Sequence, residues 1–327
     1  MTTGSSESPA QPTGRVVVGG AGGFMGGVLV QRLRESGRQV LTVGRRGADL
    51  RWDDDAGLAR AVDGASLVLG LAGKSVNCRY TPANRAEILR SRVGTTAALG
   101  RAIRTADAPP PLWINASTAT IYRHAEDRPM TERAGELGEG FSVGIARAWE
   151  REFFSGELPG TRRVALRTAI VLGHGGVLGP IGALARLGLG GAQWDGRWPI
   201  PASRRRAGTA HRFGARWGAQ RFSWIHVEDV ARIVGFLESR PELDGPINVA
   251  SPNPSTNREL QATVRRVLGI PFGVPMPRWM LEIGAAAIRT ETELVLKSRW
   301  VLPERIQEAG FRFAYPHLEP ALRESFS

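Results

Sequence analysis

The sequence predicts an α/β fold with a doubly wound parallel sheet, and three features support this prediction. Short apolar runs recur along the first 250 residues, and none shows the alternation typical of a strand with one exposed face. Stretches with helical spacing separate these runs, and a glycine-rich turn follows the first of them. Buried strands joined by helical crossovers are typical of a parallel sheet covered on both faces.

The first apolar run and the turn after it have the pattern of a phosphate-binding motif. Val16 to Val18 form a β-branched run, and the sequence GGAGGFMG follows, with glycines at positions 20, 23 and 26. Glycine tolerates positive φ and lets the backbone approach a pyrophosphate closely. Met25, Leu29 and Leu33 then recur every four residues, so a helix is expected to begin here with free N–H groups near the phosphates. We therefore predict that Gly20, Gly23, Phe24, Met25 and Gly26 bind a dinucleotide.

The remaining elements follow in alternation. Further strands are predicted at 40–43, 67–71, 112–116, 164–168 and 247–250, with helices at 88–103, 141–154 and 230–237. From residue 251 the pattern changes to helices separated by prolines. We expect a disordered tail at 1–14, a Rossmann-type NAD(P)-binding domain at 15–250, and a small C-terminal domain at 251–327 that forms the substrate lobe.

Composition excludes several classes of protein. No segment of the 327 residues has the roughly 18 consecutive apolar residues that a membrane helix requires. The first fourteen residues lack the apolar core of a signal peptide, and the single cysteine, Cys78, fits a reducing compartment, so we predict a cytoplasmic protein. The five histidines are scattered without paired spacing or partner cysteines, so no metal site is expected.

The net charge of +12 comes almost entirely from arginine, because the only lysines are Lys74 and Lys297. Residues 196–221 form an insert with seven arginines and no acid. A flexible, solvated loop is the favoured interpretation of this insert, and a patch that binds nucleic acid or phosphate is the alternative. Nucleic acid is not expected as a partner, because few aromatic residues interleave with the charges and no known module is present.

The end of the second strand indicates which dinucleotide is bound. An acid at this position would bind the ribose 2′-hydroxyl of NAD, whereas an arginine accommodates the 2′-phosphate of NADP. Here the strand runs into Gly44, Arg45 and Arg46, and the first acid is Asp49. NADP(H) is therefore the predicted cofactor, with either arginine as its phosphate ligand. The alternative is that both are ordinary surface arginines.

Several motifs in order give the chain a family resemblance. They are LAG at 71–73, NRAEILRSRVGTT at 84–96, AWE at 148–150, RTAIVLG at 167–173, RLGLGG at 186–191, WIHVED at 224–229, NVASP at 248–252 and the segment ELVLKSRWVLPERIQEAGF near the end. With these motifs, the chain resembles the atypical extended short-chain dehydrogenases/reductases, in the nucleoside-diphosphate-sugar epimerase-like branch with its small C-terminal domain.

The resemblance implies roles for individual residues. The pyrophosphate would be surrounded by Gly20, Gly23 and Gly26, and the 2′-phosphate would be held by Gly44 and Arg45. The adenosine would lie along Leu71, Ala72 and Gly73. Glu87 and Arg92 would approach the cofactor from the side, and Val171 would flank the nicotinamide. One departure is Gly19, which stands where many relatives have threonine. This change removes a hydroxyl but leaves the loop intact.

The resemblance also implies a catalytic tyrosine and, four residues later, a lysine that lowers its pKa. This pair is missing, because residues Asn84, Glu126 and Glu319 follow the three tyrosines Tyr80, Tyr122 and Tyr315 at that spacing. In the helix concerned, either Phe141 and Ile145 or Ser142 and Ala146 occupy the two positions, and neither lysine is placed to help. The preceding strand end retains Ser117 and Thr118, with Thr118 at the hydroxyl position.

Substitute groups can be proposed from the residues that follow this strand end. Tyr122 is the first candidate, and His124 lies in the charged loop after it. Packing of Tyr122 against the cofactor is the favoured alternative. Two functions remain open: an NADP-dependent oxidoreductase or epimerase acting on a small, anionic substrate, and a non-catalytic protein that binds or senses NADP(H). The long insert at 196–221 is predicted to act as a mobile lid, and Lys74 to line the mouth of the site.

Overall fold

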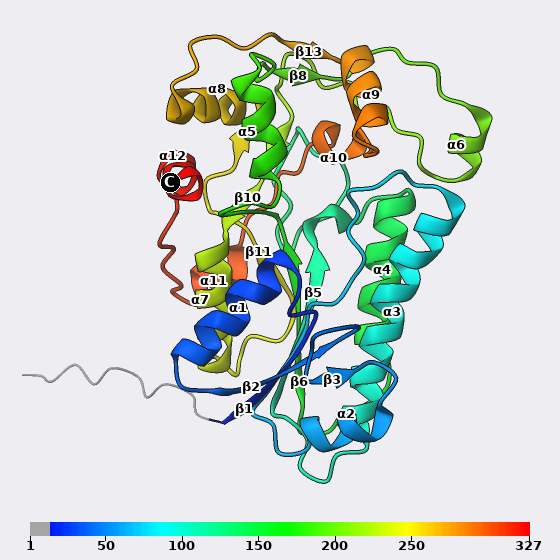
Figure 1. The fold of residues 1–327 in the computed structure, drawn as a ribbon, viewed down its shortest axis with the longest axis vertical. Coiled ribbons are helices and arrows are strands. Elements are labelled where there is room, and N and C mark those ends of the chain that lie inside the picture. Colours follow the sequence, from blue (N-terminus) through cyan, green and yellow to red (C-terminus); the bar gives the residue numbers. More distant parts are fainter. Residues whose placement is uncertain (1–13) are drawn as a thin grey trace, which may run out of the picture.

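The computed structural model describes residues 14–327, so the predicted tail lies, except for Gly14, outside the described residues. Its centre is a seven-stranded parallel sheet with the order β11-β6-β5-β4-β1-β2-β3 (Figure 1). The strands are β1 (Arg15–Gly19), β2 (Gln39–Gly44), β3 (Leu50–Arg51), β4 (Leu67–Gly70), β5 (Leu112–Thr118), β6 (Arg162–Thr168) and β11 (Gly245–Val249). The predicted doubly wound α/β fold is thus confirmed.

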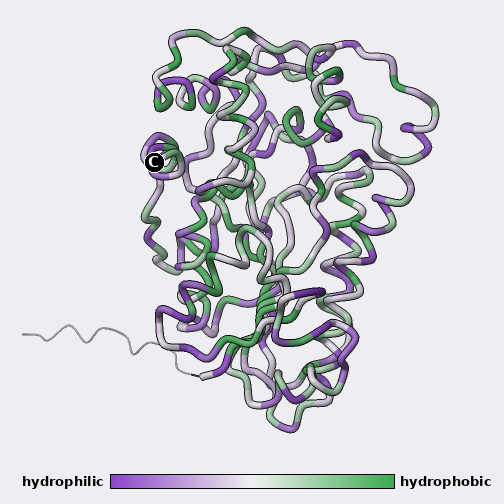
Figure 2. Tube along the Cα trace, viewed as in Figure 1, coloured by the Kyte–Doolittle hydropathy of each residue, from purple (hydrophilic) through white to green (hydrophobic). Residues whose placement is uncertain are grey.

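Helices cover both faces of the sheet, which explains why the strands are apolar throughout. Val16 and Val18 pack on one side with α1 (Phe24–Glu35) and α7 (Val227–Glu238). Val17 points to the other side, where α2 (Asp55–Val62), α3 (Pro82–Arg104) and α4 (Phe141–Phe153) lie. All three valines are fully buried, and the most hydrophobic segments lie along the sheet between the two helix layers (Figure 2). Alternate residues of one strand therefore contribute to two separate cores.

Strand β1 marks the point where the order of the sheet reverses. It pairs with β2 on one side and with β4 on the other, and Gly19 lies opposite both Val43 and Gly70. Ligands of such sheets bind outside the carboxyl ends of the strands at this switch point. The glycine turn after β1 lies at that position.

A second lobe sits above these carboxyl ends (Figure 1). It contains α5 (Leu178–Arg186), β8 (Gln193–Trp194), α6 (Ala202–Arg206), α8 (Asn257–Leu268), β13 (Met276–Pro277), α9 (Arg278–Ala287) and α10 (Glu293–Leu296). One core cluster joins Leu178 and Ala185 to Leu260 and Val264, so the lobe combines two separate stretches of the chain. The second lobe therefore does not begin at the predicted boundary, residue 250, because it also includes elements that come earlier in the chain, such as α5 and β8.

The last stretch of the chain returns to the sheet. Short strands β7 (Ile170–Leu172), β9 (Arg221–Phe222), β10 (Trp224–His226) and β12 (Ser255–Thr256) connect the two lobes, and α11 (Glu304–Glu308) and α12 (Leu318–Phe326) follow. Ile306 of α11 and Phe311 belong to the same core as β1. Among residues 14–327, no helix is long and apolar enough to cross a membrane.

Candidate functional site

A groove at the switch point follows the carboxyl ends of β1, β2 and β4. Its walls are the glycine turn 20–23, the loop 44–49 and residues 71–73, and its volume is about 1340 Å³. Pockets for drug-sized ligands are usually ~300–1,000 Å³, so this groove has room for a dinucleotide. The structure thereby brings together most of the residues predicted to bind the cofactor.

The glycines of the turn have different structural roles. Gly20 has a φ of +90°, and a Cβ there would lie 2.6 Å from the backbone nitrogen of Ala72. At Gly26 a Cβ would lie 2.3 Å from the carbonyl oxygen of Gly20, so no side chain fits at either position. Gly23 precedes α1 without any side-chain cap, and the first turn of the helix contains no acid. The free N–H groups of this turn can therefore receive an anion.

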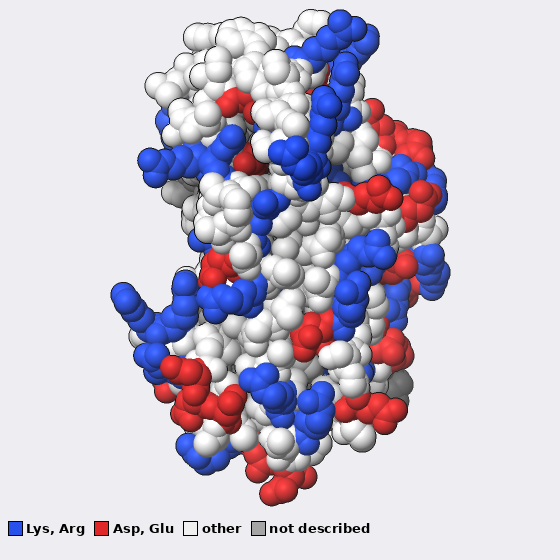
Figure 3. Space-filling model, turned by 90° about the vertical axis from the view of Figure 1, so that its right-hand side faces the viewer, with Lys and Arg blue, Asp and Glu red and all other residues white. Residues whose placement is uncertain are grey.

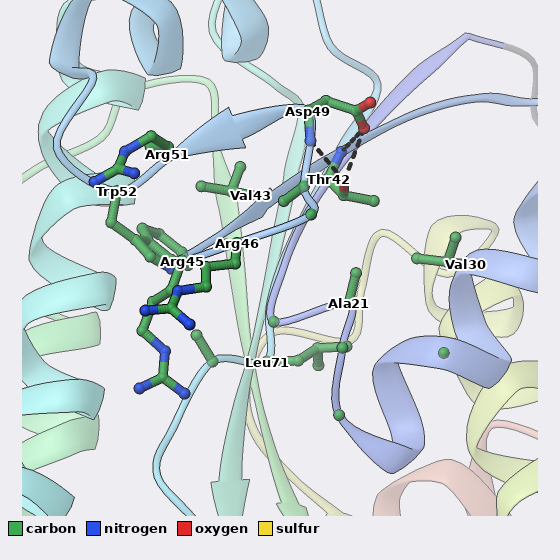
Figure 4. Close-up of a pocket in the computed structure, with 18 of the residues that line it drawn as sticks. Ala21, Val30, Thr42, Val43, Arg45, Arg46, Asp49, Arg51, Trp52 and Leu71 are labelled. Atoms are coloured by element: carbon green, nitrogen blue, oxygen red, sulfur yellow. Dashed lines mark hydrogen bonds between the residues drawn. The ribbon is translucent and has the colours of Figure 1, made fainter.

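Arg45 and Arg46 extend side by side from the loop after β2 (Figure 4). Both are exposed, and neither forms a hydrogen bond or an ion pair with any residue between 14 and 327. The nearby acid, Asp49, is turned back onto β2, where its Oδ2 accepts bonds from Thr42 N at 2.8 Å and Thr42 Oγ1 at 2.7 Å. These bonds lower the pKa of Asp49. The acid is thus held away from the two guanidinium groups, which remain free for a phosphate.

Trp52 is a groove residue that the sequence analysis did not identify. Its indole lies over Gly19, where a Cβ would come within 2.6 Å of Trp52 Cη2. Gly19, the departure from threonine, therefore makes room for an aromatic ring beside Arg45 (Figure 4). A flat, half-buried ring that lines the groove next to the arginines can stack on an adenine. The sequence contained only one signal of this contact, namely that Gly19 ends one strand and Trp52 directly follows another.

The predicted cofactor residues Phe24, Met25 and Val171 do not line this groove. Met25 and Val171, like Leu71 of the groove wall, pack against the core that contains β1. Phe24 faces the loop after β7, where a Cβ at Gly173 would lie 2.9 Å from its Cζ. These positions connect the turn after β1 with the end of β7.

The two candidates on α3 differ. Glu87 forms a surface ion pair of 2.6 Å with Arg90. Arg92 instead reaches the end of β4, where it donates to the carbonyl of Lys74 at 2.9 Å and lies over the ring of Trp149. Burial lowers the pKa of Arg92 to about 10, and no carboxylate of residues 14–327 pairs with it. Arg92 therefore fits the predicted approach from the side, whereas Glu87 is held by its neighbour.

Ser117 and Tyr122 do not face the crevice, contrary to their predicted catalytic role. Ser117 Oγ donates to Glu150 Oε1 at 2.6 Å, and Arg167 binds both oxygens of the same carboxylate. Arg167 Nη1 donates to the hydroxyl of Tyr122 at 3.0 Å, and that hydroxyl donates to Asn248 Oδ1 at 2.8 Å. Tyr122 is 1% exposed and Ser117 is 6% exposed. Because these bonds use both hydroxyls, the buried network of residues 117, 122, 150, 167 and 248 supports the fold.

Thr118 is the one predicted catalytic hydroxyl that remains half-buried at the end of β5. Its Oγ1 accepts a bond of 3.2 Å from the backbone N–H of Thr120. The structure also distinguishes the two alternatives on α4. Phe141 and Ile145 pack toward α3, whereas Ala146 packs beneath Ala119, next to Thr118. Ala146 therefore lies on the face of α4 that is turned toward the end of β5.

The second lobe brings charged groups to this strand end that the sequence analysis missed. Lys297 Nζ donates to the carbonyl of Thr120 at 2.8 Å, and Arg299 Nε donates to Thr120 Oγ1 at 3.2 Å. His124 Nδ1 accepts from Ser298 N at 3.0 Å. Lys297 therefore reaches this strand end from the other lobe, an approach that spacing along the chain cannot show.

Tyr80 also lies near α4, with its ring 4.8 Å from that of Phe141. Burial raises the pKa of Tyr80 to about 12, and the charge of Glu293 adds to this effect. Ser142 Oγ donates to Glu293 Oε2 at 2.9 Å. The phenol is therefore in its neutral form over the physiological pH range. Among residues 14–327, no group of three or more potential ligands could hold a metal ion.

The arginine-rich insert is anchored at its middle, in contrast to the favoured interpretation as a free, solvated loop. Arg204 forms ion pairs with Glu291 at 2.7 Å and Glu282 at 3.5 Å, both in the second lobe. The carbonyl of Gly208 accepts the first N–H of α4, from Phe141, at 2.9 Å. The insert thus bridges α4 and the second lobe. Figure 3 shows that lysine and arginine side chains gather in the upper part of one face of the molecule. The motion of the insert as a lid stays a prediction.

Comparison with known proteins gives two family matches. A model of the NAD dependent epimerase/dehydratase family matches residues 16–139, and a domain of unknown function, DUF1731, matches residues 276–325. The chain is 33% identical over 323 residues to the epimerase family protein SDR39U1 of Bos taurus, which covers 95% of this chain and 99% of that protein. It is 29% identical to the epimerase family protein YfhF of Bacillus subtilis (strain 168), over 94% and 97% of the two chains.

Solved structures give the same picture. The crystal structure of human SDR39U1 (isoform 2) with NADPH matches with a TM-score of 0.80 and 28% identity, over 95% of this chain and 98% of that chain. MoeE5 in complex with UDP-glucose and NAD matches with a TM-score of 0.68 and 22% identity, over 95% and 97%. The second likeness shows the fold alone. The first extends over both lobes described above.

Proposed function

Since the chain belongs to the NAD dependent epimerase/dehydratase family, among its SDR39U1-like members with a C-terminal DUF1731 domain, we propose that its groove binds NADP(H). One observation carries this proposal: Arg45 and Arg46 are free at the end of β2, while Asp49 is bound to Thr42. A guanidinium matches a phosphate in geometry and charge. The crystal structure of human SDR39U1 with NADPH supports the same cofactor.

The groove fits the rest of this cofactor as well. Any side chain at Gly20 or Gly26 would collide with the backbone, so the turn stays tight. The uncapped start of α1 would face the pyrophosphate, and Trp52 would stack on the adenine. When bound, NADPH supplies a hydride to an electrophilic carbon. The residues of this chain bind and orient the cofactor beside the end of β5.

We further propose an oxidoreductase or epimerase-like enzyme that acts on a small anionic substrate. Arg92 approaches the strand ends from α3, and Lys297 and Arg299 approach them from the second lobe, and no acid among residues 14–327 forms an ion pair with any of the three. Buried cations without acidic partners favour an anionic ligand. Thr118 would then hydrogen-bond to the reacting oxygen of this substrate.

A non-catalytic protein that binds or senses NADP(H) is the second candidate. It is favoured by the buried network, which uses the hydroxyls of Ser117 and Tyr122 for structure. Incubation with NADPH and a panel of carbonyl and sugar-nucleotide substrates separates the two candidates. Loss of absorbance at the nicotinamide band, or conversion of a sugar nucleotide to its epimer, supports the enzyme, and neither change with any substrate supports the sensor.

The cofactor itself is tested by replacing the free arginines. Arg45→Ala and Arg46→Ala remove one charge-assisted contact each, so the variant that removes the phosphate ligand should bind NADPH about 10- to 100-fold more weakly. Binding of NADH, which lacks the 2′-phosphate, should change less than about twofold. Arg205→Ala is the matched control, because this arginine is exposed on the insert. Equal losses for NADPH and NADH in both variants would contradict the proposal.

A further inference from the structure

The end of β5 is bound by a lysine from the opposite lobe. Lys297 Nζ lies 2.8 Å from the carbonyl oxygen of Thr120. The N–H of the same residue, Thr120, donates to Thr118 Oγ1 at 3.2 Å. The ammonium group and the Thr118 hydroxyl thus bind the same short turn, the first at the carbonyl of Thr120 and the second at its N–H.

The helix that faces this turn has no cationic group of its own there. Ala146 of α4 is fully buried against Ala119, and Ser142 donates to Glu293 of the second lobe. This face of α4 therefore cannot supply an ammonium group. Lys297 brings one to the same turn from the second lobe.

The surroundings of Lys297 favour a group that exchanges a proton. The residue is 5% exposed, and no acid among residues 14–327 forms an ion pair with it. The charged and titratable groups around it are Arg299, Glu293 and His124. Burial lowers the pKa of Lys297 to about 8, the charge of Arg299 lowers it further, and Glu293 opposes the shift. A lysine with this pKa can both give up and regain a proton near neutral pH.

We propose that Lys297 is the acid–base group of a reaction at the end of β5, and this inference rests on the proposed function. As a substrate carbonyl takes up the hydride that NADPH supplies, its oxygen gains the electron pair of the C=O bond and takes a proton from the Lys297 ammonium. Thr118 holds that oxygen by a hydrogen bond. The neutral amine of Lys297 then regains a proton from water, so one carbonyl, one hydride and one proton give one alcohol.

The two-lysine composition of the chain allows a direct test. Protein that contains [ε-13C]lysine has only two lysine resonances, from Lys74 and Lys297, and the variant Lys74→Arg assigns them. We expect the Lys297 resonance to titrate near pH 8 in the free protein. Oxidised nicotinamide carries a positive charge and reduced nicotinamide carries none. The pKa of Lys297 should therefore be lower by about one unit in the NADP+ complex than in the NADPH complex.

The alternative is that Lys297 only ties the second lobe to the β5 turn. In that case its titration would be the same in both complexes, and this result would overturn the inference. Binding of each cofactor is measured separately by calorimetry. Failure of both cofactors to bind contradicts the proposed function itself, whereas binding of both with an unchanged pKa contradicts only the role of Lys297.

Discussion

The groove after β2 and the end of β5 differ in what their polar side chains do. In the groove, Arg45 and Arg46 have no partner among residues 14–327 and point into open space. At the end of β5, Ser117 and Tyr122 are bound into a network with the ion pair of Glu150 and Arg167. Both regions place polar residues after a buried strand. The difference teaches that this sequence signal marks a ligand site only where no internal partner is available.

The largest effect is expected when the buried network at the end of β5 is disrupted. Glu150→Gln removes the charge that compensates Arg167, whose side chain is 10% exposed in the native fold. Removing one partner of a buried ion pair typically costs about 3–5 kcal/mol. We expect a loss of this size in the free energy of unfolding, measured by urea denaturation. The variant should bind NADPH normally under conditions where it is folded.

An exposed ion pair provides the control for this variant. Arg133 and Glu308 are 2.6 Å apart, but their side chains are 62% and 50% exposed. Exposed pairs contribute about 0–1 kcal/mol, so Arg133→Ala should have little effect on unfolding. If Glu150→Gln were as mild as this control, the network around Glu150 would not stabilise the fold.

A smaller difference in the free energy of unfolding is expected between variants of Ser117 and Thr118, the two adjacent hydroxyl residues at the end of β5. Ser117→Ala removes a 2.6 Å bond to a carboxylate, and such bonds contribute about 1.5–3 kcal/mol. Thr118→Val removes only the acceptor for one backbone N–H at 3.2 Å, worth about 1 kcal/mol or less. Urea unfolding should therefore show a larger loss for Ser117→Ala. The opposite order would mean that Thr118 supports the fold and Ser117 is free for a ligand.

Local patterns predicted the sheet and most of its helices, because each buried strand needs a continuous apolar run. The start of α3 was placed at residue 88, although Thr81 and Pro82 carry the N-cap and first-turn signals of a helix that begins six residues earlier. The glycine turn and the arginines after β2 were also predictable, since their roles depend on neighbours along the chain.

Contacts between distant residues could not be predicted in the same way. Lys297 meets Thr120 across 177 positions of sequence, and Arg204 of the insert meets Glu291 across 87. Such pairs depend on how the second lobe packs on the strand ends. Spacing along one helix shows that the usual lysine is missing. It cannot show which groups of another lobe reach the same strand end.

The smallest effect on stability is expected in the groove, at Gly22. A Cβ at this position has no atom within 4 Å, so Gly22→Ala should change the free energy of unfolding by less than about 0.5 kcal/mol. The new methyl group nevertheless lies in the turn that lines the groove, and it should weaken NADPH binding measured by calorimetry. Gly26→Ala is the contrasting variant, because its Cβ would lie 2.3 Å from the Gly20 carbonyl oxygen and should cost about 1–3 kcal/mol. Unchanged NADPH affinity in Gly22→Ala would mean that the pyrophosphate does not pass over this part of the turn. A substitution in the groove can thus weaken cofactor binding and leave the stability of the fold unchanged. Glu150→Gln is expected to do the reverse, because it lowers stability and leaves NADPH binding unchanged.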